Sequence, residues 1–99
     1  MAQRIIWSPQ ARQDKKEIIT YWKLRLGTNT YSRKLDKLFD NAISLISRHP
    51  KIGWKTDVEN VRAKLVENHL IIYDDTNNGV NILTLWDTRR NPKTLIIKK

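Results

Sequence analysis

Apolar residues recur at helical spacing through residues 9–26. One stripe of them falls within a third of a turn on a helical projection, as in a helix that packs on a core; its members are Ala11, Ile18, Ile19, Trp22 and Leu26. Ser8 can cap the start of this helix, Pro9 suits its first turn, and Gly27 can end it in the left-handed conformation. Lys15 falls inside the stripe, so it must either extend its ammonium outward or mark where the stripe meets solvent.

A second helix is predicted from residues 28–30 to about Arg48, because Pro50 restricts the residue before it. Its apolar positions again share one face, with Ile43 at the edge; the members are Tyr31, Leu35, Leu38, Phe39, Ala42, Leu45 and Ile46. The short link at Gly27 makes the two helices an antiparallel hairpin. A mostly basic sector lies on the outer face: Arg33, Lys34, Lys37, Asn41 and Arg48. It fits a solvated face, which is the commoner case, or a stripe that tracks phosphates.

The period of the pattern changes from 3.6 to 2 after the link at residues 50–54. Apolar and basic side chains alternate in residues 61–65, which predicts a strand with one solvent-exposed face. A turn at residues 67–69, an apolar run at residues 70–73 and a second turn at residues 74–79 follow. The second turn contains Asn-Asn-Gly, which suits positive φ angles.

Residues 80–86 carry apolar side chains on both faces, which predicts a strand placed centrally in the sheet. Residues 4–7 read as a short first strand, and the apolar patch at residues 95–97 can complete the sheet. The order is β-α-α-β-β-β, so we predict an α+β fold in which a helical hairpin packs on a small antiparallel-rich sheet. The length of 99 residues predicts a single domain over residues 1–99.

Composition narrows the class of protein. With 39% hydrophobic and 8% aromatic residues, the chain is too apolar for a disordered basic tail. The absence of cysteine excludes a disulfide framework, a thiolate nucleophile and a cysteine zinc site. No apolar run approaches the ~20 residues of a membrane span, and the start lacks the apolar stretch of a signal peptide. We therefore expect a cytoplasmic protein that does not contact membranes.

The chain has 19 Lys+Arg against 10 Asp+Glu, a formal net charge of +9. Residues 1–49 hold ten basic and four acidic side chains, a net charge of +6. Residues 50–85 hold four basic and five acidic side chains, a net charge of −1, and residues 86–99 hold five basic and one acidic, a net charge of +4. The excess therefore lies at the two ends of the chain. It fits an anionic partner, such as nucleic acid or an acidic protein surface, and equally a self-repelling soluble surface.

Few residues offer catalytic chemistry. His49 lies beside a helix end and His69 in a predicted turn, so a cap and an exposed turn residue are the commoner interpretations. Asp74 and Asp75 are interpreted as turn residues. The sequence has no glycine-rich phosphate loop, nucleophile elbow or zinc signature. We therefore expect no metal, no cofactor and no small-molecule substrate.

A set of arginines on the predicted sheet remains. Arg62 projects from the polar face of its strand, and Arg89 and Arg90 follow the end of the central strand. If both strands belong to one sheet, these guanidinium groups could face a common groove and bind phosphate or acidic groups. The alternative is that Arg62 pairs with Glu67 or Asp87 and holds the sheet edge.

Four parts of the chain, in register, resemble the RelE/ParE superfamily of bacterial type II toxins. They are residues 8–22 (SPQARQDKKEIITYW), residues 49–53 (HPKIG), VR at 61–62 with LIIY at 70–73, and residues 82–92 (ILTLWDTRRNP). They resemble the family's first strand-to-helix segment, the link after its second helix, its arginine strand with the next hairpin arm, and its last strand with an Arg-x-Pro exit. The similarity spans nearly the whole chain and agrees with the predicted element order.

The resemblance implies a small toxin that a cognate antitoxin neutralises, with one of two targets. RelE-like members cleave mRNA in the ribosomal A site: the 2′-hydroxyl attacks, basic residues bind the phosphate, and a Tyr, His or Glu transfers protons. ParE-like members poison DNA gyrase and are not known for such chemistry. Arg62 and Arg89 match the phosphate-binding positions, but residues 91–95 lack the Tyr or His that follows in RelE-like enzymes. Without general acid–base help the rate falls about 10²–10⁴-fold; Tyr73, which looks like core, and His69 are the remaining candidates.

We therefore expect a toxin of a type II toxin-antitoxin module, of the plasmid-stabilisation kind, that inhibits growth through DNA gyrase. The first alternative is a ribosome-dependent mRNA endoribonuclease that uses no metal, so enzymatic activity is left open. The second is a non-toxic basic nucleic-acid-binding module, which little beyond the charge favours. Exposed apolar residues near the helical hairpin and residues 95–97 are candidate antitoxin contacts.

Overall fold

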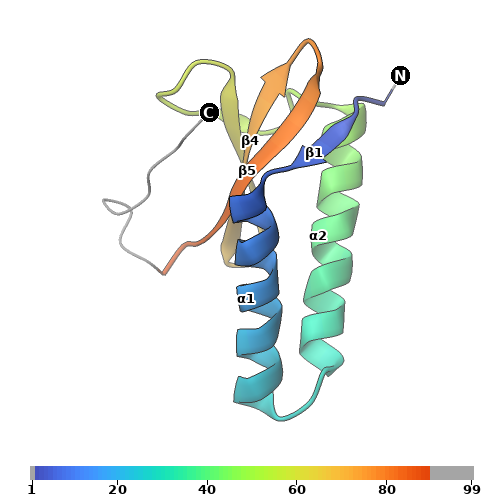
Figure 1. The fold of residues 1–99 in the computed structure, drawn as a ribbon, viewed down its shortest axis with the longest axis vertical. Helices are drawn as coiled ribbons and strands as arrows, with labels where there is room; N and C mark the ends of the chain where they lie inside the picture. Colours follow the sequence, from blue (N-terminus) through green and yellow to red (C-terminus); the bar gives the residue numbers. More distant parts are fainter. Residues whose placement is uncertain (1, 90–99) are drawn as a thin grey trace.

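The computed structural model describes residues 2–89, in which two helices lie side by side against a five-stranded sheet (Figure 1). The α+β fold is therefore confirmed. The elements are β1 (Ile5–Trp7), α1 (Pro9–Leu26), α2 (Thr30–Arg48), β2 (Trp54–Lys55), β3 (Val61–Val66), β4 (His69–Thr76) and β5 (Gly79–Asp87). Arg90 and the apolar patch at residues 95–97 lie outside the described residues.

The strands are ordered β1-β5-β4-β3-β2. β1 pairs with β5 in parallel, and the other three pairs are antiparallel, as expected of an antiparallel-rich sheet. β5 has a partner on each side, which confirms its predicted central placement. The two-residue strand β2 was not predicted, because two residues are too few to show an alternating pattern.

Both ends of α1 follow the local signals in the sequence. The Ser8 hydroxyl accepts a hydrogen bond from the Ala11 amide at 2.9 Å, and Gly27 ends the helix at φ 68°. The Ser8 hydroxyl also donates to the Leu83 carbonyl at 2.8 Å, which joins the helix start to β5. Leu26, predicted to face the core, is 48% exposed. Figure 1 shows the reason: the far end of the hairpin extends beyond the sheet.

Lys15 joins the two helices. Its ammonium lies 2.8 Å from Asp36 and 3.6 Å from Asp40, both on α2, and 5.4 Å from the centre of the Trp7 ring. Burial works against the charge, but the hydrogen bond to Asp36 and the charge of Asp40 outweigh it and raise the pKa of Lys15. The polar residue in the apolar stripe therefore forms an ion pair across the hairpin.

The main core lies between the helices and one face of the sheet. Leu35, Phe39 and Ile46 of α2 are fully buried against Ile71 and Ile82. Alternate residues of the strands form a second, smaller cluster on the opposite face: Val61, Ala63 and Ile72. Ile43, expected at the edge of the α2 stripe, is buried. One prediction of burial was wrong: Leu65, expected on the dry face of β3, is 48% exposed.

The tight link after α2 is held by Tyr73. Its hydroxyl donates to the Pro50 carbonyl at 2.7 Å and accepts from the Gly53 amide at 2.9 Å. A Cβ at Gly53 would lie 2.7 Å from the Ala63 carbonyl oxygen, so only glycine fits there. The prediction that Tyr73 belongs to the core is confirmed, and its hydroxyl is engaged inside the fold.

The β4–β5 hairpin is tighter than predicted. Asp74 and Asp75 belong to β4 rather than to the turn, because they pair with Asn81 and Val80 of β5. The strands meet at Thr76 and Gly79. Gly79 has φ 132°, and a Cβ there would lie 2.6 Å from the Arg4 carbonyl oxygen in the neighbouring chain segment. Of the turn sequence Asn-Asn-Gly, only the glycine takes a positive φ.

Candidate functional site

Arg62 lies on β3 opposite Tyr73 and is bound to the backbone of the link. Its Nη1 donates to the Gly53 carbonyl at 2.8 Å and to the Lys51 carbonyl at 3.3 Å. These bonds differ from the expected alternative, in which Arg62 pairs with Glu67 or Asp87. The guanidinium is half-buried and held in place by two carbonyls, which leaves its positive charge without a carboxylate among these contacts.

Arg89 follows β5 and is paired with Asp87. Its Nη2 lies 2.7 Å from the Asp87 carboxylate, and its Nε donates to the two oxygens at 3.1 and 3.2 Å. The guanidinium also lies 5.4 Å from the centre of the Trp22 ring. The hydrogen bond from Arg89 is the main reason that the pKa of Asp87 is lowered.

The structure does not bring Arg62 and Arg89 into one groove. β3 and β5 both run antiparallel to β4, so they run parallel to each other. Arg62 is near the start of β3, whereas Arg89 comes after the end of β5. The two guanidinium groups therefore belong to opposite ends of the sheet. Arg90, the third predicted site residue, lies outside the described residues.

A cavity of about 300 Å³ adjoins Arg62, and we call it the β3 pocket. Its charged lining residues are Lys51, Lys55, Glu59, Arg62 and Asp75. Three cations thus face two carboxylates. Lys51 and Lys55 were not among the predicted site residues, because Lys51 lies in the link and Lys55 in the two-residue strand β2, where no periodic pattern indicates the direction of a side chain.

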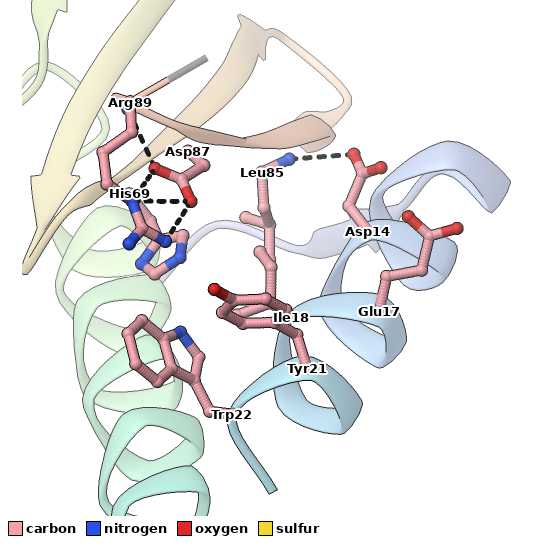
Figure 2. A pocket seen from close by; sticks show the side chains of 9 residues that line it. All are labelled: Asp14, Glu17, Ile18, Tyr21, Trp22, His69, Leu85, Asp87 and Arg89. Carbon is pink, nitrogen blue, oxygen red and sulfur yellow. Dashed lines mark hydrogen bonds and ion pairs between the residues drawn. The ribbon is translucent and has the colours of Figure 1, made fainter. Parts of the chain in front are cut away.

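A larger cavity of about 490 Å³ lies between α1 and the end of β5 (Figure 2), and we call it the α1–β5 pocket. It is lined by Asp14, Glu17, Ile18, Tyr21, Trp22, His69, Leu85, Asp87 and Arg89. Of these residues only Arg89 was a firm site prediction. Tyr21 and Trp22 form an edge-to-face pair with ring centres 5.1 Å apart.

Asp14 joins α1 to β5 inside this pocket. Its carboxylate accepts hydrogen bonds from the Thr84 hydroxyl at 2.5 Å, the Leu85 amide at 3.1 Å and the Gln10 side chain at 2.7 Å. Asp14 is only 6% exposed, so these bonds are what allows a carboxylate to be buried there. The sequence offered one signal for this role, a carboxylate close to the apolar face of α1.

His69 is buried, which corrects the expectation of an exposed turn residue. It is the first residue of β4, is 1% exposed and meets the Phe39 ring edge-on at 5.5 Å. The turn before it is shorter than predicted, because Glu67 takes φ 54° and reverses the chain early. Burial is the main cause of the lowered pKa of His69, so the fold favours the neutral imidazole.

Metal chemistry has little support in residues 2–89. No group of three His, Cys, Asp or Glu side chains in this part of the chain is close enough together to hold a metal ion. Nor does either helix of the described chain have the length and apolarity needed to cross a membrane.

A helical hairpin packed on a mixed five-stranded sheet is consistent with the fold of the RelE/ParE superfamily of toxins. The chain belongs to the ParE toxin family, because the sequence model of the ParE toxin of the type II toxin-antitoxin system, parDE, matches residues 5–92. Its fold is similar to that of a chain from the chromosomal ParDE toxin-antitoxin system of P. aeruginosa, with a TM-score of 0.76 and 14% identity. That similarity covers 89% of this chain and 98% of the other. No curated protein matches the sequence.

Proposed function

We propose that this ParE-family toxin inhibits growth by acting on DNA gyrase in the cytoplasm and that a cognate antitoxin neutralises it. The observation that carries the proposal is the match of the ParE family over residues 5–92. Antitoxin contacts are proposed at the far end of the helical hairpin, where Leu24 is 77% and Leu26 48% exposed, and at Tyr21 nearer the sheet, which is 45% exposed. Apolar side chains at this exposure are typical of a surface that a partner covers.

The bonding of Tyr73, the residue opposite Arg62, supports gyrase over RNA cleavage. A nuclease needs a group that exchanges protons beside the bound phosphate. Tyr73 is the residue opposite Arg62, but its hydroxyl is already bonded to Pro50 and Gly53. Burial is the main cause of the raised pKa of Tyr73, so it is a poor base at neutral pH.

The surroundings of Arg89 support the same conclusion. Its guanidinium is paired with Asp87, and Asp14 and Glu17 line the same pocket. Three carboxylates against one guanidinium repel a phosphate, even though the imidazole of His69 is near. Because Arg62 and Arg89 lie at opposite ends of the sheet, a single phosphate does not reach both.

One observation favours the second candidate, a ribosome-dependent mRNA endoribonuclease. The β3 pocket combines the cations Lys51, Lys55 and Arg62 with the carboxylate of Glu59. Such a set offers phosphate binding together with a general base. The experiment therefore has to include both targets.

Purified toxin is incubated with gyrase, ATP and supercoiled DNA, and in parallel with a reconstituted translation reaction. We expect covalent gyrase–DNA cleavage complexes and intact mRNA, and preincubation with the cognate antitoxin removes the complexes. Topoisomerase I replaces gyrase as the control for general DNA damage. mRNA cuts at codon positions that require ribosomes, with no gyrase complexes, would establish the nuclease instead.

A further inference from the structure

The α1–β5 pocket has a charge opposite to that of the molecule. The chain carries +9, but the pocket lining has the carboxylates of Asp14, Glu17 and Asp87 against the single guanidinium of Arg89, a formal charge of −2. An acidic cavity in so basic a protein is selective, because it attracts cations locally while the rest of the surface repels them.

Arg89 shows which chemical group this environment holds. Its guanidinium takes the Asp87 carboxylate at 2.7 Å and lies 5.4 Å from the centre of the Trp22 ring. A carboxylate together with an aromatic face is a recurrent setting for guanidinium groups. Arg89 engages only one of the three carboxylates in these bonds, and Glu17 lines the same cavity from an exposed position on α1.

His69 provides an observation that does not depend on the carboxylates. It is 1% exposed and lines the pocket, and its Nδ1, which is itself covered, has no hydrogen-bond partner within residues 2–89. A buried polar atom without a partner costs about 1–3 kcal/mol, so a ligand that supplies one gains affinity. The tautomer that carries its proton on Nε2 presents Nδ1 as an acceptor, which suits a donor-rich ligand. Figure 2 shows the imidazole at the cavity together with Trp22 and Ile18.

The other residues that line the pocket favour a ligand with an apolar part. Ile18, Leu85 and the Trp22 ring supply apolar walls, and the volume of about 490 Å³ lies within the usual range of small-molecule sites, roughly 300–1,000 Å³. The pocket therefore offers carboxylates and a hydrogen-bond acceptor next to an apolar wall that a ligand can cover.

We propose that the α1–β5 pocket binds a guanidinium or amidinium group carried on an apolar body. Glu17 takes the charge, the imidazole of His69 turns its covered Nδ1 toward the cavity to accept an N–H, and the apolar part of the ligand lies against Ile18, Trp22 and Leu85. The arginine side chain of a bound protein and a free organic cation share this chemistry. The site is separate from Arg62 and does not depend on gyrase being the target.

The test is a titration of ¹⁵N-labelled full-length protein, followed by the Leu85 amide and the Trp22 indole N–H. Benzamidine is the free cation and capped arginine (acetyl-arginine methylamide) is the peptide-borne one; benzamide and benzoate are the neutral and anionic controls. We expect saturable shifts around the pocket with a dissociation constant of about 1 mM or tighter for at least one cation. Tighter binding of capped arginine identifies a protein side chain as the occupant, and tighter binding of benzamidine identifies a free molecule.

A matched pair of variants tests whether the negative charge of Glu17 contributes to cation binding. Glu17→Gln keeps the shape of an exposed side chain and should weaken cation binding about threefold or more. Glu59→Gln makes the same charge change at the β3 pocket, at the other end of the sheet, and should leave the affinity unchanged. The proposal is overturned if benzoate binds as well as benzamidine, if neither cation saturates by about 10 mM, or if both variants behave alike.

Discussion

The imidazole of His69 occupies a position where burial, rather than a charged neighbour, has the largest effect on protonation. It packs against Phe39 and is almost completely covered. The charge of Arg89 adds to the effect of burial in lowering the pKa, while the charges of Asp87 and Glu67 oppose it. The folded protein therefore binds a proton at His69 less readily than the unfolded chain does.

The stability of the fold should depend on pH through this residue. As pH falls below the ordinary value of 6.5, the unfolded chain takes up a proton at His69 that the folded protein does not. The free energy of unfolding should therefore fall with pH, by at most about 1.4 kcal/mol per pH unit, until the folded protein is protonated as well. Urea unfolding between about pH 7.5 and 5.5 measures the effect.

Variants of His69 and His49 show whether His69 causes the pH dependence of stability. His69→Gln should flatten the pH dependence in this interval, whatever it does to the stability itself. His49→Gln changes an exposed residue at the end of α2 and leaves His69 in place, so the slope should persist. Equal slopes in both variants would assign the pH dependence to other groups.

Residue roles could be predicted where they depend on near neighbours in the chain. The cap at Ser8 and the stop at Gly27 were predicted correctly because each is a local interaction. The burial of His69 and of Asp14 was not, because it depends on residues that are distant in the sequence: Phe39 for one, Thr84 and Leu85 for the other. The α1–β5 pocket therefore escaped a prediction based on sequence pattern.

At the scale of elements, one carboxylate connects α1 to the middle of the sheet. Asp14 accepts from the Thr84 hydroxyl and the Leu85 amide, both on β5. β5 bulges relative to β4 near these positions, with a register shift between Ile72 and Tyr73. Because a bulge leaves ladder groups unpaired, a side chain from another element can bond to them.

Removing this carboxylate should weaken the packing of helix on sheet. Asp14→Ala leaves buried donors on Thr84 and Leu85 without an acceptor, and we expect a loss of about 2–3 kcal/mol in the free energy of unfolding. Asp14→Asn retains one oxygen and should lose less. Chemical denaturation measures both.

Asp40→Ala is the matched control, because Asp40 is an exposed carboxylate 3.6 Å from Lys15. A contact of that kind contributes about 1 kcal/mol or less. If Asp14→Ala and Asp40→Ala cost the same, the bonds to β5 contribute little to stability.

The order of the predicted elements followed from the change of period along the chain, and the central placement of β5 followed from its apolar residues on both faces. The short strand β2, the bulge in β5 and the continuation of β4 through Asp74 did not. Each of these depends on which partner strand lies alongside, and that information is spread over distant parts of the sequence.

For the whole molecule, the main correction is the separation of the arginines. Arg62 and Arg89 stand at opposite ends of the sheet, one bound to backbone carbonyls and the other to Asp87. A large target such as gyrase can span both ends, whereas one phosphate cannot. Instead of the predicted common groove, the two arginines occupy separate sites, Arg62 beside other cations and Arg89 among carboxylates.

We expect Arg62→Ala and Arg89→Ala each to relieve toxicity while the domain stays folded. Arg62 loses two hydrogen bonds to carbonyls, at a cost of about 1 kcal/mol, which a folded domain tolerates. Growth after induction measures toxicity, and circular dichroism with thermal unfolding measures the fold. Arg33→Ala, on the exposed face of α2, is the control. Undiminished killing by both sheet variants would show that neither arginine contributes to toxicity.

The link between α2 and β2 has a consequence for the order in which the protein opens. Residues 50–53 form no regular element, yet the Gly53 amide is bonded to the hydroxyl of a buried tyrosine. That amide cannot reach water until Tyr73 leaves the core. The segment that also supplies the carbonyls for Arg62 therefore opens together with the sheet rather than with the surface loops.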